Sequence, residues 1–391
     1  MFPRRGAASA EVERRIAALC GKDYSYRGGT VFNSISSEPL PCAARIFKRH
    51  LAANMGDNRI FPSLPQAERR VTAMLGELLG AGNAHGMVVS GGTEANLLAM
   101  AAAVRQFRSS RQNARRPQVL APESVHFSVE KAAVMLDVEL VRAPLDSQYR
   151  VDVDGLRRRI CGRTALVIVT AGTSECGAID DVASVAEFTR RAGIPLHVDA
   201  ATGGFLIPFA RELGYEMPEF DFSVPGVTSI TIDPHKYGFA PVPAGCLLAR
   251  DSGVMAGLNF ESHYVGTRNH ASLLGTRPGA GVLATYAALM CMGRDGYREA
   301  VGRLFRSRDL FLDEALRQGL RLAYRPQLTI VGIRVDSPRS ALSYLEARGL
   351  IASVSKRHDF LRIVVQRHLR GKDYRELLKH LKALSPVGAT A

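Results

Sequence analysis

Apolar residues recur along the chain at two spacings, and these spacings predict its helices and strands. In residues 66–79 the apolar side chains repeat every three to four positions, as on one face of an amphipathic helix, at Val71, Met74, Leu75, Leu78 and Leu79. Short apolar runs typical of buried strands occur at residues 85–90, 118–121, 139–142, 165–170, 196–198, 229–232 and 245–249. Helices are predicted between them at residues 94–108, 128–136 and 182–192.

Strands that alternate with helices favour a mainly parallel sheet covered on both faces. The pattern changes after about residue 280, where helices are predicted at 281–292 and 297–318, strand–helix–strand at 329–335, 342–348 and 361–365, and a last helix at 372–384. Two short helices are expected near the start, at residues 9–21 and 41–55. We therefore predict an α/β fold in three parts: an N-terminal helical segment (1–55), a large domain (56–280) and a smaller C-terminal α+β domain (281–391).

The formal net charge of +14 raises the question of a nucleic-acid or anionic membrane partner. The basic residues are spread through the whole chain, and the densest arginine cluster, residues 105–116, contains Phe107 as its single aromatic residue. Since no nucleic-acid-binding module is recognisable, we predict a solvated basic surface that attracts anionic small molecules, and no nucleic-acid partner.

Membrane, secretory and metal functions find no support in the sequence. No run of about 18 apolar residues predicts a transmembrane helix, and residues 1–13 contain no apolar stretch typical of a secretory signal. We therefore expect a cytoplasmic protein with no membrane partner. The six cysteines are scattered without a CxxC pair, which argues against a zinc site and against a disulfide framework.

Two charged residues stand directly after predicted strands. Lys236 lies among apolar residues, where an amine can lose its proton and form a Schiff base, although a lysine after a strand is more often a surface charge. Asp199 precedes small residues that leave room for a flat ring, and it could pair with a protonated pyridine nitrogen. The alternative for Asp199 is a cap on the following helix.

Two further segments complete the candidate site. Residues 90–96 place two glycines at a strand-to-helix turn, where free backbone N–H groups, the helix dipole and the Thr93 hydroxyl suit a phosphate. His126 follows another strand and could stack on a ring, although a lone histidine is more often structural. Four features therefore follow what we take to be four consecutive strand ends: a turn for a phosphate, a histidine that can stack on a ring, an acid and a lysine. We interpret this combination as a binding site for pyridoxal 5′-phosphate (PLP).

Three long strings, SGGTEANLLAM, HVDAATGGFLIPF and SITIDPHKYGFAPVPAG, carry a resemblance to a known family. From about residue 33 to the last helix, the chain resembles the fold-type I, group II PLP-dependent amino-acid decarboxylases, most of all the archaeal L-tyrosine/L-aspartate decarboxylases. The resemblance implies a fold-type I PLP-dependent transferase fold. It also implies decarboxylation of an L-amino acid to a primary amine and CO2.

The resemblance assigns the residues around the cofactor ring. Lys236 matches the Schiff-base lysine, and His235 matches the histidine just before it. Asp199 matches the partner of the pyridine nitrogen, and Ala201 lies under the ring. His126 matches the histidine that stacks on the other face and is also implicated in substrate positioning.

The same resemblance implies roles for residues further from the ring. Gly92 and Thr93 match the phosphate-binding turn, and Ser174 stands where the family usually has a threonine near the ring hydroxyl. Arg362 matches the arginine that holds the substrate α-carboxylate, although taken alone it reads as a surface charge on a strand. Tyr264 corresponds to a tyrosine on an active-site loop and, beside His126, is a candidate donor of the proton to Cα.

The string GTRPG at residues 275–279 is similar to the segment that reaches the cofactor phosphate of the neighbouring subunit. Through Thr276 and Arg277 it implies a homodimer with sites shared across the interface. The sequence does not decide whether the side chain of the substrate is acidic or aromatic. Four basic residues expected near the mouth of the active site favour an anionic side chain: His263, Arg268, Arg357 and His358. Two other functions stay open, a carbon–carbon aldehyde lyase resembling sphingosine phosphate lyase and a non-catalytic scaffold with the same fold.

Overall fold

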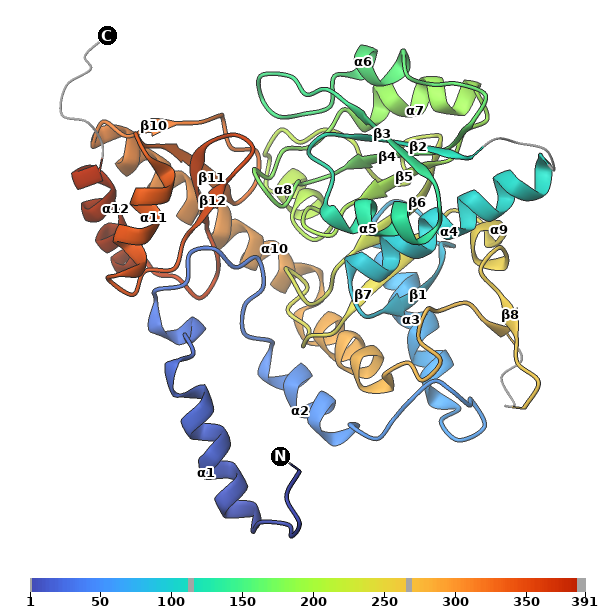
Figure 1. Cartoon of the computed structure of the whole chain (residues 1–391), viewed down its shortest axis with the longest axis horizontal. Helices are drawn as coiled ribbons and strands as arrows, with labels where there is room; N and C mark the ends of the chain where they lie inside the picture. The colour runs from blue at the N-terminus through green and yellow to red at the C-terminus, as the bar shows by residue number, and fades with distance from the viewer. Residues whose placement is uncertain (1, 112–115, 265–268, 385–391) are drawn as a thin grey trace.

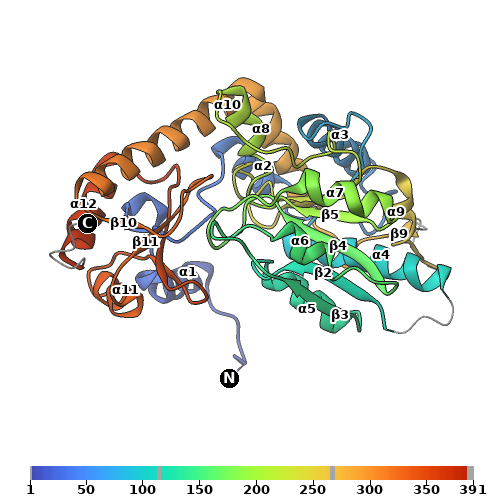
Figure 2. The same cartoon turned by 90° about the horizontal axis from the view of Figure 1, so that it is seen from above.

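The structure, a computed structural model, describes residues 2–111, 116–264 and 269–384. A large α/β domain and a smaller domain lie side by side, and the long helix α10 (Gly279–Arg317) runs across both (Figures 1 and 2). Among the described residues, no helix is both long and apolar enough to cross a membrane.

Seven strands form the central sheet of the large domain in the order β1-β7-β6-β5-β4-β2-β3. Their bounds are β1 (His85–Val89), β2 (Gln118–Pro122), β3 (Glu139–Ala143), β4 (Thr164–Thr170), β5 (Leu196–Asp199), β6 (Val227–Ile232) and β7 (Gly245–Ala249). All neighbours from β6 to β3 are parallel, whereas β7 is antiparallel to both β1 and β6. The predicted α/β fold with a mainly parallel sheet is confirmed.

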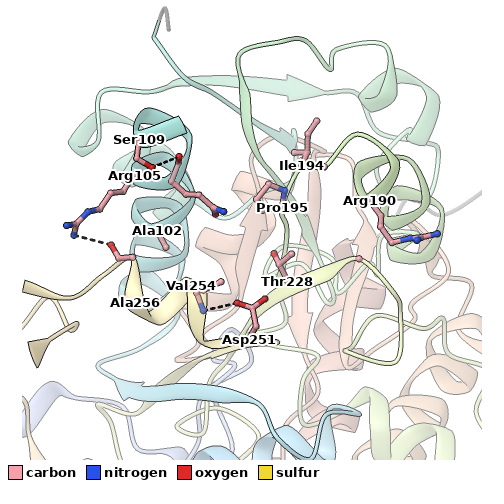
Figure 3. Close-up of a pocket in the computed structure, with 15 residues that line it drawn as sticks. Ala102, Arg105, Ser109, Arg190, Ile194, Pro195, Thr228, Asp251, Val254 and Ala256 are labelled. Carbon is pink, nitrogen blue, oxygen red and sulfur yellow. Dashed lines mark hydrogen bonds between the residues drawn. The ribbon is translucent and has the colours of Figure 1, made fainter. Parts of the chain in front are cut away.

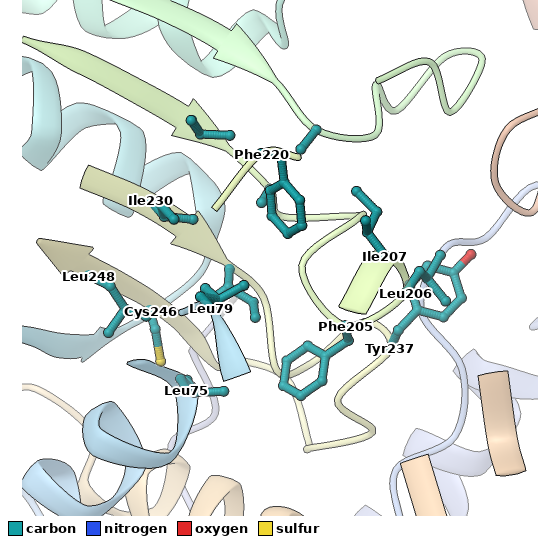
Figure 4. Packing of buried hydrophobic residues seen from close by; sticks show 14 of the residues in the cluster. Leu75, Leu79, Phe205, Leu206, Ile207, Phe220, Ile230, Tyr237, Cys246 and Leu248 are labelled. Atoms are coloured by element: carbon teal, nitrogen blue, oxygen red, sulfur yellow. The ribbon is translucent and has the colours of Figure 1, made fainter. Parts of the chain in front are cut away.

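Helices cover both faces of this sheet. They are α3 (Ser63–Leu78), α4 (Gly92–Ser110), α5 (Phe127–Met135), α6 (Val153–Arg157), α7 (Val182–Arg191), α8 (Ile207–Glu212) and α9 (Ser252–Ala256). In β4 the alternation of side chains separates the two cores: Val167 and Val169 pack with α3, α7 and α8, whereas Leu166 and Ile168 pack with α4 and α5. Figure 4 shows the first core, where Leu75 of α3 lies beside Cys246 of β7.

The smaller domain is an antiparallel sheet in the order β10-β11-β13-β12, covered by α11 (Pro338–Glu346) and α12 (Gly371–Leu384). Its strands are β10 (Arg321–Leu322), β11 (Ile330–Arg334), β12 (Ser353–Ser355) and β13 (Phe360–Val364). Helix α10 belongs to both domains, since Phe305 packs in the core of the large domain and Phe311 in that of the small one. Within α10, the side chains that pack in the large-domain core end near Phe305 and those that pack in the small-domain core begin near Phe311. The predicted domain boundary, between residues 280 and 281, lies at the start of this helix.

Helix α10 also joins the two helices predicted at residues 281–292 and 297–318. Gly293 lies between them with φ 57° and ψ −179°, outside helical geometry, so it interrupts the helix at the predicted gap. A residue with a side chain is strained at this positive φ, which explains why glycine stands at the break.

The N-terminal region begins with α1 (Ser9–Leu19), which buries no residue and projects away from both domains (Figure 1). It continues through η1 (Cys20–Lys22) and η2 (Tyr26–Gly28) to α2 (Pro41–Arg49), which packs against α10. The prediction of a helix to residue 55 was too long, because the chain leaves α2 to form a backbone bridge between Asn54 and Pro278.

Several short elements had not been predicted from the sequence. They are α6, α8, α9, β10, β12 and the paired strands β8 (Phe260–Glu261) and β9 (Asn269–His270). Each has two to six residues, too few for an apolar period to be visible.

Candidate active site

A cavity of about 300 Å³ opens at the carboxyl ends of the parallel strands. Its lining residues are Ser90, Gly91, Gly92, Thr93, Asn96, His126, Ser174, Asp199, Ala201, Asp233, His235 and Lys236. The four predicted signals therefore meet in one place. The strands that carry them are β1, β2, β5 and β6, however, so the prediction of four consecutive strand ends was wrong.

Asp199 is the last residue of β5 and is almost completely buried. Its Oδ2 accepts a hydrogen bond from Asn96 Nδ2 at 2.8 Å, and its Oδ1 accepts one from the Ala201 backbone N–H at 3.1 Å. These two donors hold the plane of the carboxylate. Asp199 therefore does not cap a helix; it presents a fixed negative charge to the cavity.

Lys236 follows β6 by four residues, and its Nζ lies 3.0 Å from Asp233 Oδ2. Asp233 is buried, and its Oδ1 has no hydrogen-bond partner among the described residues. The same carboxylate lies 3.7 Å from Nε2 of His235, whose Nδ1 accepts the Ala244 backbone N–H at 3.2 Å. Sequence reasoning had assigned no role to Asp233, although it stands three residues before the lysine in the same motif.

The turn between β1 and α4 forms another wall of the cavity. A Cβ atom added at Gly92 would lie 3.0 Å from Asp233 Oδ2 and 3.2 Å from the Ala201 Cβ, so a larger residue would crowd the floor of the site. Gly92 and Thr93 begin the 19-residue helix α4, whose first N–H groups have no intrahelical acceptor. This geometry suits a phosphate, and the phosphate-binding role of this turn stays a prediction.

His126 caps α5, and its Nδ1 accepts the Ser128 backbone N–H at 3.3 Å. Burial lowers the pKa of His126 below its usual value, and the negative charge of Asp199 partly opposes this shift. His126 and Ala201 both line the cavity, so a flat ring has a planar side chain and a small one available to contact.

Arg362 lies beside the cavity, in β13, and is 9% exposed. Its Nε donates to the backbone O of Ser174 at 2.9 Å, which links it to the cavity lining. Its Nη1 donates to Asn33 O at 3.0 Å and to Ser353 Oγ at 3.1 Å, whereas Nη2 has no hydrogen bond to the described residues. One face of the guanidinium is thus held by the protein and one nitrogen is available to a ligand.

Other predicted site residues do not line the cavity of their own chain. Tyr264 is 91% exposed. Thr276 is exposed, and Arg277 forms a partly buried ion pair with Glu68 while its Nη1 donates to Val88 O at 2.7 Å. Their roles stay predictions that require a second subunit.

Of the four basic residues expected near the mouth, the three that the structure describes also lie away from the lining. His358 packs on Tyr149 with ring centroids 4.2 Å apart, and Arg357 donates to Glu123 O. His263 is exposed, and Arg268 lies outside the described residues.

The cavity fits pyridoxal phosphate by the chemistry of its donors. The cofactor needs an amine for attachment, a carboxylate for its ring nitrogen and free N–H groups for its phosphate. Lys236, Asp199 and the turn at Gly92 meet these needs on three walls. The volume lies at the lower end of the range for ligand sites.

A larger hollow of about 550 Å³ lies at the opposite, amino ends of β5 and β6, near Pro195 and Thr228 (Figure 3). Its charged side chains include Arg105, which donates to Gly257 O, and Asp251, which accepts the Gly253 N–H. It has no lysine in its lining, so it offers no amine for a Schiff base and is not the candidate site.

Comparisons with known proteins agree with this geometry. The family described as "Pyridoxal-dependent decarboxylase conserved domain" matches residues 30–325. A probable L-tyrosine/L-aspartate decarboxylase of Methanothermobacter thermautotrophicus is 39% identical over 362 residues, 92% of this chain and 98% of that protein. The L-aspartate decarboxylase of Thermococcus kodakarensis is 38% identical over 388 residues, 98% of this chain and 99% of that protein.

Solved structures show the same fold. The sphingosine-1-phosphate lyase of Burkholderia pseudomallei superposes with a TM-score of 0.88 at 25% identity, covering 98% of this chain and 92% of that one. The glutamate decarboxylase of Lactobacillus brevis gives a TM-score of 0.87 at 20% identity, covering 100% of this chain and 96% of that one. The predicted resemblance is confirmed, over nearly the whole chain.

Proposed function

The chain belongs to the pyridoxal-dependent decarboxylase family, and from this premise we propose that it decarboxylates an acidic L-amino acid, with L-aspartate as the first substrate to test. Its cofactor is pyridoxal 5′-phosphate. The observation that carries the proposal is that Lys236, four residues after β6, and Asp199, at the end of β5, line one cavity. The reaction breaks the bond between Cα and the carboxylate, releases CO2 and places a proton on Cα to give a primary amine.

When bound, pyridoxal phosphate supplies the electron sink that accepts the electron pair of the broken bond. Lys236 would hold it covalently, Asp199 would keep a proton on its ring nitrogen, and the turn at Gly92 and Thr93 would bind its phosphate. His126 and Ala201 would contact the two faces of the ring. Ser174 would lie near the ring hydroxyl and His235 beside Lys236.

Arg362 would bind the substrate α-carboxylate through Nη2, because its other nitrogens are already held by Ser174, Asn33 and Ser353. A guanidinium recognises a carboxylate better than an ammonium does, since its N–H groups match the two oxygens. The proton that reaches Cα would come from Tyr264 or His126.

The preference for an acidic side chain rests on the relatives and on charge. Two relatives carry aspartate in their names, and one of these names also includes tyrosine, which makes tyrosine the aromatic alternative. The net charge of +14 favours the approach of anionic substrates.

We also propose that the active form is a homodimer in the cytoplasm. Helix α1 buries no residue, and its apolar residues Val12, Ile16 and Leu19 are exposed at helical spacing. An apolar groove of about 390 Å³ lies between α2, α3 and α10. A second subunit would cover such surfaces and could bring Tyr264 and Thr276 to the neighbouring cavity.

The experiment is an assay of the purified protein with pyridoxal phosphate and L-aspartate, L-glutamate or L-tyrosine, measuring CO2 and amine. We expect amine from an acidic substrate and visible absorption from the lysine-bound cofactor. Lys236→Ala should abolish both, whereas Lys131→Ala, an exposed lysine on α5, should keep both. Retention of the absorption in pure Lys236→Ala protein would refute the assignment.

The same assay separates the alternative functions. The similarity in fold to the sphingosine-1-phosphate lyase supports testing a phosphorylated amino alcohol, from which a carbon–carbon lyase would release an aldehyde. A protein that binds the cofactor and turns over none of these compounds would instead act as a scaffold.

A further inference from the structure

Asn96, on the buried face of α4, makes hydrogen bonds that use the full capacity of its amide. Its Nδ2 donates to Asp199 Oδ2 at 2.8 Å and to Ser128 Oγ at 3.0 Å. Its Oδ1 accepts from Thr231 Oγ1 at 2.8 Å and from His197 Nε2 at 3.1 Å. A side-chain amide has two donor hydrogens and two acceptor lone pairs, so no bond is left unmade.

The orientation of this amide follows from its partners. An ionised Asp199 only accepts hydrogen bonds, so the nitrogen of Asn96 faces it and the oxygen faces His197. His197 therefore carries its proton on Nε2. Burial lowers the pKa of His197 to about 4, so the ring is neutral near pH 7 and its Nδ1 accepts the Ser229 hydroxyl at 2.8 Å.

A second branch of the network leads to His126. Ser128 Oγ accepts from Asn96 and lies 2.9 Å from His126 Nδ1, and the Ser128 backbone N–H also points to Nδ1, at 3.3 Å. A backbone N–H can only donate, so Nδ1 is the acceptor. In neutral His126 the proton is therefore on Nε2, which has no hydrogen bond to the described residues.

We propose that Asn96 is a positioning residue: its amide holds Asp199 against the ring nitrogen of the cofactor and, by donating to Ser128 Oγ, directs the hydroxyl hydrogen of Ser128 to Nδ1 of His126. This hydroxyl acts together with the Ser128 backbone N–H to keep the proton of His126 on Nε2. His126 then offers a substrate an N–H donor and not a lone pair. This inference rests on the proposed function, because it assigns Asp199 and His126 to the cofactor. Asn96 acts through its hydrogen bonds to Asp199 and Ser128.

Three variants separate the branches. Asn96→Leu keeps the size of the side chain and removes both branches, Ser128→Ala removes the hydroxyl that leads to His126, and Thr189→Val removes a buried hydroxyl on α7 that bonds only within its own helix. The readouts are the dissociation constant of pyridoxal phosphate and the ¹⁵N NMR signals of His126 in histidine-labelled protein, assigned with His126→Gln.

We expect Asn96→Leu to bind pyridoxal phosphate about 10- to 100-fold more weakly, the scale of a lost hydrogen bond to a charged group. It should also shift the Nδ1 signal of His126. Ser128→Ala should shift that signal with less than about a twofold change in affinity, within RT ln 2. Thr189→Val should change neither.

Wild-type affinity and an unshifted signal in folded Asn96→Leu would overturn the inference. Equal losses of affinity in Asn96→Leu and Ser128→Ala would overturn the division into two branches. If Asn96→Leu does not fold, Asn96→Asp keeps the shape but sets a second carboxylate 2.8 Å from Asp199, and unchanged affinity there would be equally decisive. Absence of cofactor absorption in the wild type would refute the proposed function instead.

Discussion

Replacing Arg362 by alanine tests whether this arginine binds substrate or only holds the fold. The guanidinium makes three hydrogen bonds within the protein, to Ser174 O, Asn33 O and Ser353 Oγ, and leaves Nη2 without a partner among the described residues. A hydrogen bond between charged groups contributes about 1.5–3 kcal/mol. Its loss should lower kcat/KM about 10- to 150-fold. The two carbonyl groups left without donors should also lower the free energy of unfolding by about 1–3 kcal/mol each.

Two measurements separate these effects. Kinetics of amine formation give kcat/KM, and urea unfolding gives stability. Ser353→Ala is the matched control, because it removes one internal partner of Arg362 and leaves Nη2 untouched; it should reduce stability by about 1 kcal/mol and leave kcat/KM unchanged.

Binding of the product amine gives the sharpest test, since the product has lost the carboxylate that Arg362 is proposed to hold. Arg362→Ala should weaken binding of the amino acid and leave the dissociation constant of the amine within about twofold. Equal weakening of both ligands, or an unchanged kcat/KM in a destabilised protein, would show that Arg362 acts only in the fold.

Three further predictions concern charge and protonation. Glu68→Gln weakens the partly buried ion pair with Arg277 and should lower the free energy of unfolding in urea by about 1.5–3 kcal/mol, whereas Glu376→Gln, in an exposed pair with Lys379, should change it little. Burial lowers the pKa of His197 to about 4, so as the pH falls the histidine is protonated in the unfolded chain before it is protonated in the folded one. The buried neutral ring therefore stabilises the fold fully above about pH 6.5. This contribution to the free energy of unfolding should be lost between about pH 6.5 and 4, at up to about 1.4 kcal/mol per pH unit. Burial raises the pKa of Asp180 to about 7, and this carboxyl changes the pH dependence of stability in the opposite direction. The free energy of unfolding is therefore measured against pH in both wild type and His197→Gln, and equal slopes in the two proteins would contradict the reasoning. Tyr264→Phe should lower kcat at least about 100-fold with cofactor absorption retained, and an unchanged kcat would leave His126 as the proton donor.

The sequence predicted the large sheet and the cavity because both follow from local pattern. Apolar runs such as residues 165–170 mark buried strands, and residues after strand ends meet at one edge of a parallel sheet. Lys236, Asp199, Gly92 and His126 could therefore be placed together before the structure was known.

The network around Asn96 could not be predicted in this way. Asn96 and Asp199 are 103 residues apart, and Asn96 and Thr231 are 135 apart, so their contacts depend on how α4 packs over the sheet. Asn96 stood within a recognised motif, but the motif carries no information about which side of α4 faces β5. The position of Arg277 was equally hidden, since an arginine near a glycine turn does not show whether it meets a phosphate or Glu68.

The contacts of Glu68 explain why the segment from Leu273 to Arg277 and the phosphate turn are mechanically connected. Strand β1 is the edge of the sheet, and an edge strand leaves backbone groups unpaired. At Val88 the N–H donates to Glu68 at 2.8 Å and the carbonyl accepts from Arg277 at 2.7 Å, so the ion pair takes the place of a neighbouring strand.

The buried carboxylate of Glu94, in the first turn of α4, makes a second connection between this segment and the phosphate turn. It accepts the N–H of Ser90 at 2.7 Å, in the phosphate turn, and the N–H of Leu273 at 3.2 Å. The segment that carries Thr276 is therefore fixed at two points, to β1 and to the turn that lines the cavity of its own chain. In the proposed dimer, the segment predicted to reach the neighbouring cavity would therefore be held in place by the phosphate turn of its own subunit.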